Sequence, residues 1–128
     1  MSIDHLVLTA TEINRTIKFY CDVLGMELQT FYSIDSDKPR TALHFGDQKI
    51  NIHEKKAPLS PHASKPMPGS LDICFLSLTP IETWKKIFFK NNIKIEEGPV
   101  LKTGANGQIL SIYVRDPDLN LIEISNQI

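Results

Sequence analysis

The two halves of the chain share one order of hydrophobic patterns, in which an alternating segment precedes a helical segment and three further alternating segments. Residues 3–9 alternate between apolar and polar positions and are rich in β-branched side chains, which predicts a strand. After Thr11, apolar residues recur every three or four positions as far as Leu24, which predicts an amphipathic helix ending at Gly25. Three more strands are predicted at residues 26–33, 40–45 and 49–54.

The second half begins after residues 55–69, a proline-rich stretch that shows no periodicity and is predicted to be a linker. Residues 71–78 alternate like the first strand. Thr79 is then predicted to cap a helix that starts at Pro80 and has an apolar face. Further strands are predicted at residues 93–97, 109–115 and 120–125, with turns at residues 98–99 and 104–107.

This internal repeat determines the expected fold class. A unit of roughly 55 residues with four strands and one helix cannot bury its sheet alone, so two such units must pack together. The sequence therefore predicts an α+β protein with a single domain over residues 1–128. That domain contains two modules, approximately residues 1–54 and 70–128, joined by the linker at residues 55–69.

Composition narrows the class of protein further. Hydrophobic residues make up 41% and charged residues 23% of the 128 residues, as in an ordinary globular domain. The formal net charge of -1 provides no strong field for phosphate backbones or anionic lipids, so we expect neither nucleic acid nor membrane as a partner. The sequence starts without a basic segment followed by an apolar one, and we expect a cytoplasmic protein. Cys21 and Cys74 lack metal-type spacing and are expected to be buried thiols that form no disulfide.

Four polar side chains interrupt the apolar strands, and they carry the expected chemistry: His5, His53, Asp72 and Glu123. A buried carboxylate without a partner costs several kcal/mol, and a bound cation would remove that cost. Imidazole nitrogens with carboxylate oxygens suit Mn, Fe, Co, Ni or Zn. The four residues are therefore predicted to bind one divalent metal ion, with His53 as the fourth ligand.

Each residue also has a simpler interpretation, which the pattern leaves open. His5 fits a core histidine bonded to the backbone or to a carboxylate, and Glu123 fits an ordinary ion pair with Lys or Arg. Asp72 fits a strand-end cap, and His53 fits a solvent-exposed strand end. Their joint placement in matching strands of the two halves favours the metal site.

Three segments give the chain a resemblance to a known superfamily. They are residues 4–8 (DHLVL), 17–26 (IKFYCDVLGM) and 114–123 (VRDPDLNLIE). Together they resemble the vicinal oxygen chelate superfamily, which includes glyoxalase I, bleomycin-binding proteins, fosfomycin-resistance transferases and extradiol dioxygenases. Residues 45–49, 68–74 and 96–105 resemble the members described as glyoxalase domain-containing or virulence-associated glyoxalase-like proteins.

This resemblance implies paired βαβββ modules that form a cupped eight-stranded sheet around a metal ion, usually in a homodimer whose subunits can share a site. Matched by position, His5 and Glu123 are the first and last ligands. Asp72 stands where the superfamily commonly has His. The glutamate of the first module falls at Asn51, and His53 lies two residues further on the same face.

The expected function follows from this resemblance. We expect a metal-dependent glyoxalase-like (lactoylglutathione lyase-like) enzyme that acts on a small oxygenated or thiol-adducted substrate, with Glu123 as the catalytic proton-transfer group. One alternative is a non-catalytic protein that binds a drug or metabolite, as in bleomycin resistance. Another is a dioxygenase, since His and carboxylate ligands leave open positions on iron.

Overall fold

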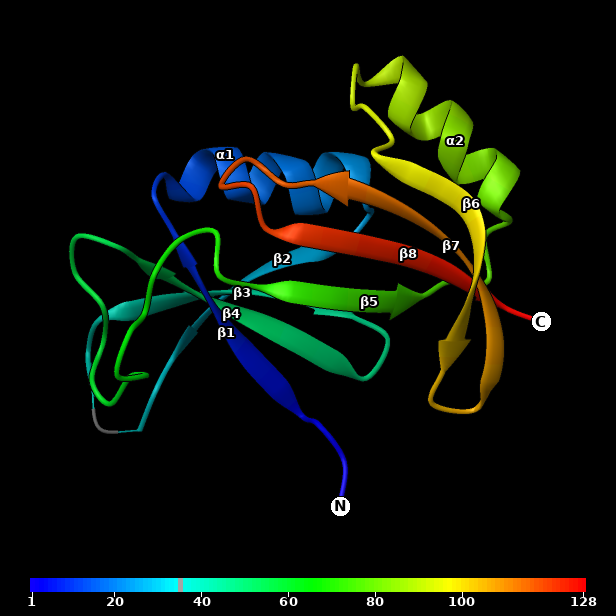
Figure 1. Cartoon of the computed structure of the whole chain (residues 1–128). Coiled ribbons are helices and arrows are strands. Elements are labelled where there is room, and N and C mark those ends of the chain that lie inside the picture. Colours follow the sequence, from blue (N-terminus) through cyan, green and yellow to red (C-terminus); the bar gives the residue numbers. More distant parts are fainter. Residues whose placement is uncertain (35) are drawn as a thin grey trace. The chain divides into compact units, whose positions relative to one another are not determined.

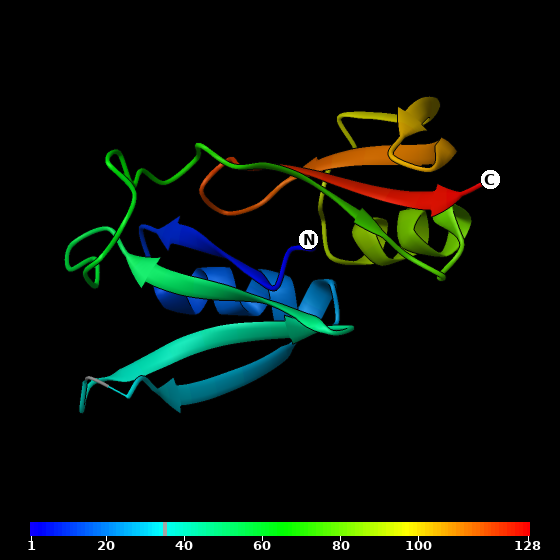
Figure 2. The same ribbon diagram turned by 90° about the horizontal axis from the view of Figure 1, so that it is seen from below.

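Each half of the chain folds around its own four-stranded mixed sheet, with a helical segment along one face (Figures 1 and 2). The computed structural model describes residues 1–34 and 36–128. It divides into unit 1, Met1–Gly69, and unit 2, Ser70–Ile128. The predicted linker at residues 55–69 thus belongs to unit 1. That the two units form one domain with a single cupped sheet stays a prediction.

Unit 1 contains four strands and two consecutive helical segments. In chain order these are β1 (His5–Ala10), α1 (Ile13–Ile17), η1 (Lys18–Val23), β2 (Glu27–Tyr32), β3 (Pro39–Phe45) and β4 (Gln48–Glu54). The strand order is β1-β4-β3-β2, with β1 parallel to β4 and the other pairs antiparallel. The four strands predicted for this half are confirmed.

The predicted single helix of unit 1 changes geometry part-way along. The segment η1 is π-helical and follows α1 without a break, and Gly25 then takes a φ of 80° that ends the helical run. Phe19 and Tyr20 lie on the buried side and form an edge-to-face pair with ring centroids 5.0 Å apart. The apolar core of this unit also includes Leu8, Leu43 and Ile50, all almost completely buried.

Unit 2 repeats this plan. It contains β5 (Asp72–Leu76), α2 (Ile81–Lys90), β6 (Glu97–Gly104), β7 (Gly107–Arg115) and β8 (Leu121–Gln127), in the sheet order β5-β8-β7-β6. β5 pairs in parallel with β8, and the remaining pairs are antiparallel. Trp84 and Phe88 of α2 stack with ring centroids 5.7 Å apart and are buried, as are Ile112, Val114 and Ile122 of the sheet.

The start of α2 differs from the predicted cap. The N-cap position belongs to Pro80, and no side chain of the cap residue closes the helix. Instead Asn126 on β8 accepts the Ile81 backbone N–H through its Oδ1 atom at 2.9 Å, and its Nδ2 atom donates to the carbonyls of Ser77 and Thr79. The helix is therefore capped by a side chain 45 residues away in sequence, and not by Thr79 as predicted.

The strand predicted at residues 93–97 also differs from the structure. The strand β6 begins only at Glu97 and runs through the predicted turn at Gly98 and Pro99. Gly98 has a φ of 104°, and a Cβ atom there would lie 2.3 Å from the Ser111 carbonyl oxygen. The pairing with β7 is irregular between Glu97 and Val100, so these turn-forming residues build a β-bulge inside a strand.

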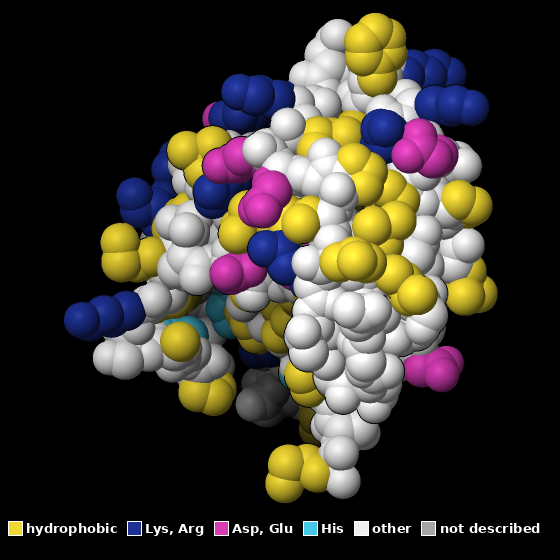
Figure 3. Space-filling view, turned by 45° about the vertical axis from the view of Figure 1, so that its right-hand side comes forward, with side chains coloured by type: hydrophobic (Ala, Val, Ile, Leu, Met, Phe, Trp, Pro, Cys, Tyr) yellow, Lys and Arg dark blue, Asp and Glu magenta, His cyan; other side chains and the backbone are white. Residues whose placement is uncertain are grey.

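The secondary structure confirms the α+β class, with a four-stranded mixed sheet in each unit and one helical run in each, α1 with η1 in unit 1 and α2 in unit 2. Among the described residues, no helix combines the length and apolar character needed to cross a membrane. Acidic and basic side chains are interspersed on the face drawn in Figure 3, in keeping with the small net charge.

Candidate functional site

The sheet face of unit 2 that points away from the apolar core carries a row of polar side chains. Strand register places Cys74 of β5 beside Glu123 of β8, Glu123 beside Tyr113 of β7, and Tyr113 beside Glu97 of β6. Because alternate residues of a strand share a face, Asp72 lies on this face too, two residues before Cys74. One face of unit 2 therefore presents two of the predicted ligands.

Glu123 is held on this face by its neighbours. The Ser125 hydroxyl donates to Glu123 Oε1 at 3.3 Å, and Ser125 is itself bonded to the Ser111 hydroxyl across 2.7 Å. Burial and a hydrogen bond to Glu123 raise the pKa of Tyr113 to about 12. The phenol thus keeps its proton at neutral pH and is available as a donor to the carboxylate.

Cys74 is a free thiol, but its residue is exposed and not buried as predicted. It contacts the same group of side chains and is a poor nucleophile. Its sulfur lies 3.3 Å from the Ser125 hydroxyl oxygen. Partial burial, followed by the nearby Glu123 charge, raises the pKa of the thiol, while the Ser125 bond acts in the opposite direction. Since the thiolate is the reactive form, Cys74 is protonated and unreactive at neutral pH.

A cavity of about 390 Å³ opens beside Glu123. Tyr113 and Cys74 line it, together with residues 102–106 at the tip of the β6–β7 hairpin. Lys102 also lines the cavity, and its Nζ atom lies 5.5 Å from the centre of the Tyr113 ring, within range of a cation–π contact. The cavity is large enough for a small organic molecule.

Asp72 and Glu123 form a pair of carboxylates on this face. Asp72 pairs with Leu121 and Glu123 with Cys74, so the two acidic residues are diagonal neighbours on parallel strands. The strand spacing and rise put their Cα atoms roughly 8 Å apart. Within residues 1–34 and 36–128, neither carboxylate has an ion-pair partner.

His5 of unit 1 is half exposed at the start of β1. Its Nδ1 atom lies 2.6 Å from Asp4 Oδ1, and this hydrogen bond lowers the pKa of Asp4. When Nδ1–H donates a hydrogen bond to a carboxylate, the lone pair of the neutral ring lies on Nε2. The same arrangement orients metal-binding histidines in many proteins.

His53 is buried, with 5% of its surface exposed, rather than solvent-exposed as its strand-end position allowed. Register pairs His5 with Lys49 and Thr9 with His53. The two histidines are therefore separated by four residues along the sheet, roughly 13 Å. Burial, followed by the charges of Arg40 and His62, lowers the pKa of His53.

No group of three metal-binding side chains is found within the described part of the chain. The predicted residues thus divide between the units, with His5 and His53 in unit 1 and Asp72 and Glu123 in unit 2. The sequence did not single out Tyr113 and Lys102, which line the cavity beside Glu123. Tyr113 could have been found, because it alternates with the apolar residues Ile112 and Val114 on its predicted strand and so faces the opposite side.

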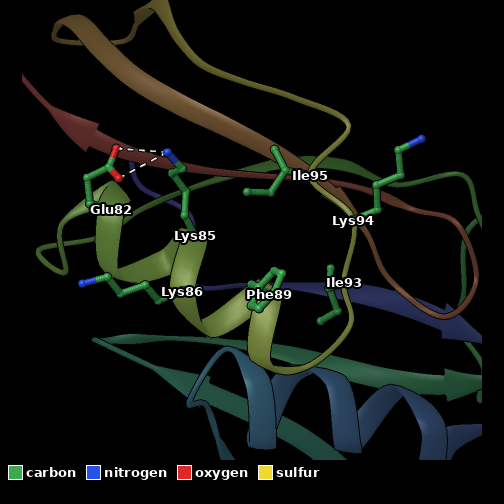
Figure 4. A pocket seen from close by; sticks show the side chains of 7 residues that line it. All are labelled: Glu82, Lys85, Lys86, Phe89, Ile93, Lys94 and Ile95. Carbon is green, nitrogen blue, oxygen red and sulfur yellow. Dashed lines mark hydrogen bonds and ion pairs between the residues drawn. The ribbon is translucent and has the colours of Figure 1, made fainter.

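A second cavity, of about 520 Å³, lies beside α2 and contains none of the predicted residues (Figure 4). Phe89, Ile93 and Ile95 form its apolar wall, and lysines surround it. Its one ion pair among the described residues joins Lys85 to Glu82 at 3.2 Å. Glu82 is the one carboxylate among the lining residues, and it is already paired with Lys85.

The sequence matches the Glyoxalase/Bleomycin resistance protein/Dioxygenase superfamily over residues 2–124. The chain belongs to this superfamily. It is 51% identical over 126 residues to virulence protein STM3117 of Salmonella typhimurium, an alignment that covers 98% of this chain and 84% of that protein. It is 48% identical over 125 residues to glyoxalase domain-containing protein RDO1 of Mycosarcoma maydis, covering 98% and 68% of the two chains.

Solved structures of the superfamily confirm the fold. The crystal structure of STM3117 superposes with a TM-score of 0.93 at 50% identity, covering 100% of this chain and 98% of the other. A lactoylglutathione lyase from Agrobacterium tumefaciens superposes with a TM-score of 0.69 at 23% identity, covering 98% and 92%. The second likeness supports the shared fold alone.

Proposed function

We propose that this superfamily member is a metal-dependent glyoxalase-like enzyme that acts on a small oxygenated or thiol-adducted molecule. The observation that carries the proposal is the pair of carboxylates on the polar face of unit 2. Asp72 and Glu123 lie on neighbouring strands, and neither has an ion-pair partner among the described residues. Two carboxylates so placed attract a divalent cation.

The donor atoms suit a metal such as Ni, Zn, Mn, Co or Fe. His5 supplies an imidazole whose Nδ1 atom is already oriented by Asp4, and Glu123 supplies a carboxylate supported by Ser125. Asp72 supplies a second carboxylate. We assign these three residues as ligands, and we leave His53 outside the set because of its distance from His5 along the sheet. In a homodimer, the ligands of one site can come from two chains.

The bound ion would act as a Lewis acid toward adjacent oxygen atoms of a substrate. Glu123 is then the residue that accepts a proton from the substrate and returns it. Tyr113 keeps its own proton at neutral pH and orients the Glu123 carboxylate. The adjacent cavity, which Tyr113 and Cys74 line, would hold the substrate beside that carboxylate.

Non-catalytic binding of a small molecule is the second candidate. The cavity beside Glu123 and the aromatic ring of Tyr113 would serve a binding protein as well as an enzyme. The two functions differ in whether Glu123 has to exchange protons, so turnover separates them. A dioxygenase would consume oxygen with a catechol and can be recognised by that measurement.

Metal content of the purified full-length protein tests the assignment. After equilibration with Mn, Co, Ni, Zn or Fe and gel filtration, elemental analysis should show about one ion per chain. His5→Gln, Asp72→Asn and Glu123→Gln should each reduce retention by at least tenfold, as expected for the loss of a ligand. Glu82→Gln changes an exposed carboxylate on α2 and should leave retention unchanged.

Activity separates catalysis from binding. With a hemithioacetal and enough free metal to saturate each variant, Glu123→Gln should reduce kcat far more than it changes KM, because the proton transfer occurs only in the transition state. Metal retention equal to that of the unchanged protein in all three ligand variants would refute the metal site. A metal-loaded protein that binds a small ligand tightly without turnover of hemithioacetals, thiols with epoxides, or catechols would establish the binding function instead.

A further inference from the structure

Unit 1 contains a group of buried polar atoms that the proposed metal site does not use. Arg40 Nε, Asn51 Oδ1 and His53 Nδ1 are inaccessible to solvent, and each lacks a hydrogen-bond partner in the described part of the chain. Asn51 and His53 are 7% and 5% exposed. A buried polar atom without a partner costs about 1–3 kcal/mol, so three of them in one place call for an explanation.

These three side chains share one face of two neighbouring strands. Asn51 and His53 are two residues apart on β4 and point to the same side. Register pairs Asn51 with Ala42 and Ile52 with Thr41, and its continuation places Arg40 of β3 directly across from His53. Opposing side chains of this kind have Cβ atoms about 5 Å apart.

The surroundings of this group are rich in positive charge. Arg40 and His62 are the charged groups that act on His53, and both are basic. On the neighbouring strand β2, Phe31 is the register partner of Arg40. The Lys49 ammonium group lies 3.9 Å from the centre of the Phe31 ring. Among the described residues, Arg40 has no carboxylate partner.

Other residues on this face do not supply the missing charge. Thr9 of β1 is the register partner of His53 and is uncharged. His44 of β3 is paired with Lys49 of β4, and neither of these two side chains is acidic. Among the strand residues that register places on this face, the acidic one is Glu27, which is paired with His44 at the opposite end of the sheet. Among the described residues of this sheet, register therefore places no carboxylate beside Arg40 or His53.

We propose that Arg40, His53 and Asn51 form a binding site for a small carboxylate anion within unit 1. An Arg guanidinium presents Nε and one Nη in a planar fork that matches the two oxygens of a carboxylate. A neutral imidazole with its proton on Nδ1 adds a third donor. Rotation of the Asn51 side-chain amide by 180° exchanges its oxygen and nitrogen positions, which have nearly the same shape. Its NH₂ group then points into the site as a further donor.

The charge of the site favours a carboxylate over a phosphate, because the one positive charge of Arg40 beside a neutral His53 balances a monoanion and would leave a phosphate dianion partly uncompensated in a buried site. Bidentate contact through Nε needs an oxygen pair in the plane of the guanidinium, and the buried Nε is one of the unpartnered atoms. The site involves neither Asp72 nor Glu123, and it stands or falls independently of the metal. Its ligand is either a separate carboxylate metabolite or the carboxylate of the substrate itself.

Thermal unfolding of the full-length protein with sodium acetate tests the proposal. At constant ionic strength made up with sodium chloride, acetate at about ten times its dissociation constant should raise the Tm by roughly 4 °C. Arg40→Gln should abolish this rise. Arg15→Gln, which removes an exposed arginine of α1 in the same unit, should preserve it.

A second measurement covers the case in which the Arg40 variant folds poorly. In ¹⁵N-labelled protein, acetate should shift the Nε–H resonance of Arg40 and leave that of Arg15 unchanged. The proposal is overturned if acetate shifts neither Tm nor this resonance, if Arg40→Gln keeps the full response, or if phosphate replaces acetate as the stronger ligand. Repeating the titration with and without divalent metal separates this result from the fate of the metal site.

Discussion

Replacing Asn120 with Ala should destabilise unit 2 strongly. Asn120 lies in residues 114–123, one of the three segments that resemble the superfamily, and it is not one of the proposed ligands. Asn120 is 1% exposed. Its Nδ2 atom donates to Asp116 Oδ2 at 2.7 Å, and its Oδ1 atom accepts the Leu71 backbone N–H at 2.8 Å. The side chain thereby joins the β7–β8 turn to the residue preceding β5.

The magnitude follows from these two bonds. The bond to the Asp116 carboxylate is charge-assisted and contributes about 2 kcal/mol, and the loss of the bond to Leu71 leaves an unpaired N–H at a cost of about 1 kcal/mol. Asp116 keeps its bonds from the backbone N–H groups of Asp118 and Asn120, so the loop does not lose every anchor. We therefore expect a loss of about 3 kcal/mol, a large part of the 5–15 kcal/mol that stabilises a typical domain.

Urea unfolding monitored by circular dichroism measures this loss. Asn91→Ala is a matched control, because its side chain also donates to a backbone carbonyl, that of Ile87 at 2.8 Å, but from the exposed end of α2. The control should lose less than about 1 kcal/mol. A loss below about 1 kcal/mol for Asn120→Ala as well would show that the buried network does not stabilise the turn.

Two further changes test particular features of the fold. Leu119 is 68% exposed and has a φ of 68°, a backbone conformation that glycine adopts without strain. Leu119→Gly should therefore raise the free energy of unfolding in urea by up to about 1 kcal/mol. A decrease of the same size would show that the backbone is not strained at this residue. Burial lowers the pKa of His53 in the folded state below its ordinary value of 6.5. At a pH between these two pKa values, His53 is protonated in the unfolded chain and neutral in the folded chain. Stability should therefore fall as the pH drops through 6.5 toward the lowered value, and urea titrations should show a shallower fall in His53→Gln; identical slopes would exclude His53 as the cause.

Local sequence was sufficient for most of the secondary structure. The alternation of residues 3–9 and the spacing from Ile13 to Leu24 report directly on which side chains face an apolar core, and such periodicity depends on neighbours in the chain. Repetition of the pattern then indicated two units of the same kind. The resemblance carried by residues 114–123 agreed with the superfamily match, and the structure shows what part of that motif does: Asp116 and Asn120 hold a turn together.

Local sequence was insufficient wherever a distant residue decides the outcome. Thr79 had the features of a helix cap, but Asn126 on another strand occupies that role. Gly98 and Pro99 had the features of a turn, but pairing with β7 keeps them inside a strand as a bulge.

The candidate sites show the same division. Sequence identified His5, Asp72 and Glu123 as polar residues in apolar strands, because the pattern alone reveals that anomaly. Only the register of the sheet placed Glu123 beside Tyr113 and Arg40 across from His53. A side chain's partners lie on neighbouring strands that are distant in sequence, so tertiary structure decides whether a buried polar group is satisfied or left to bind a ligand.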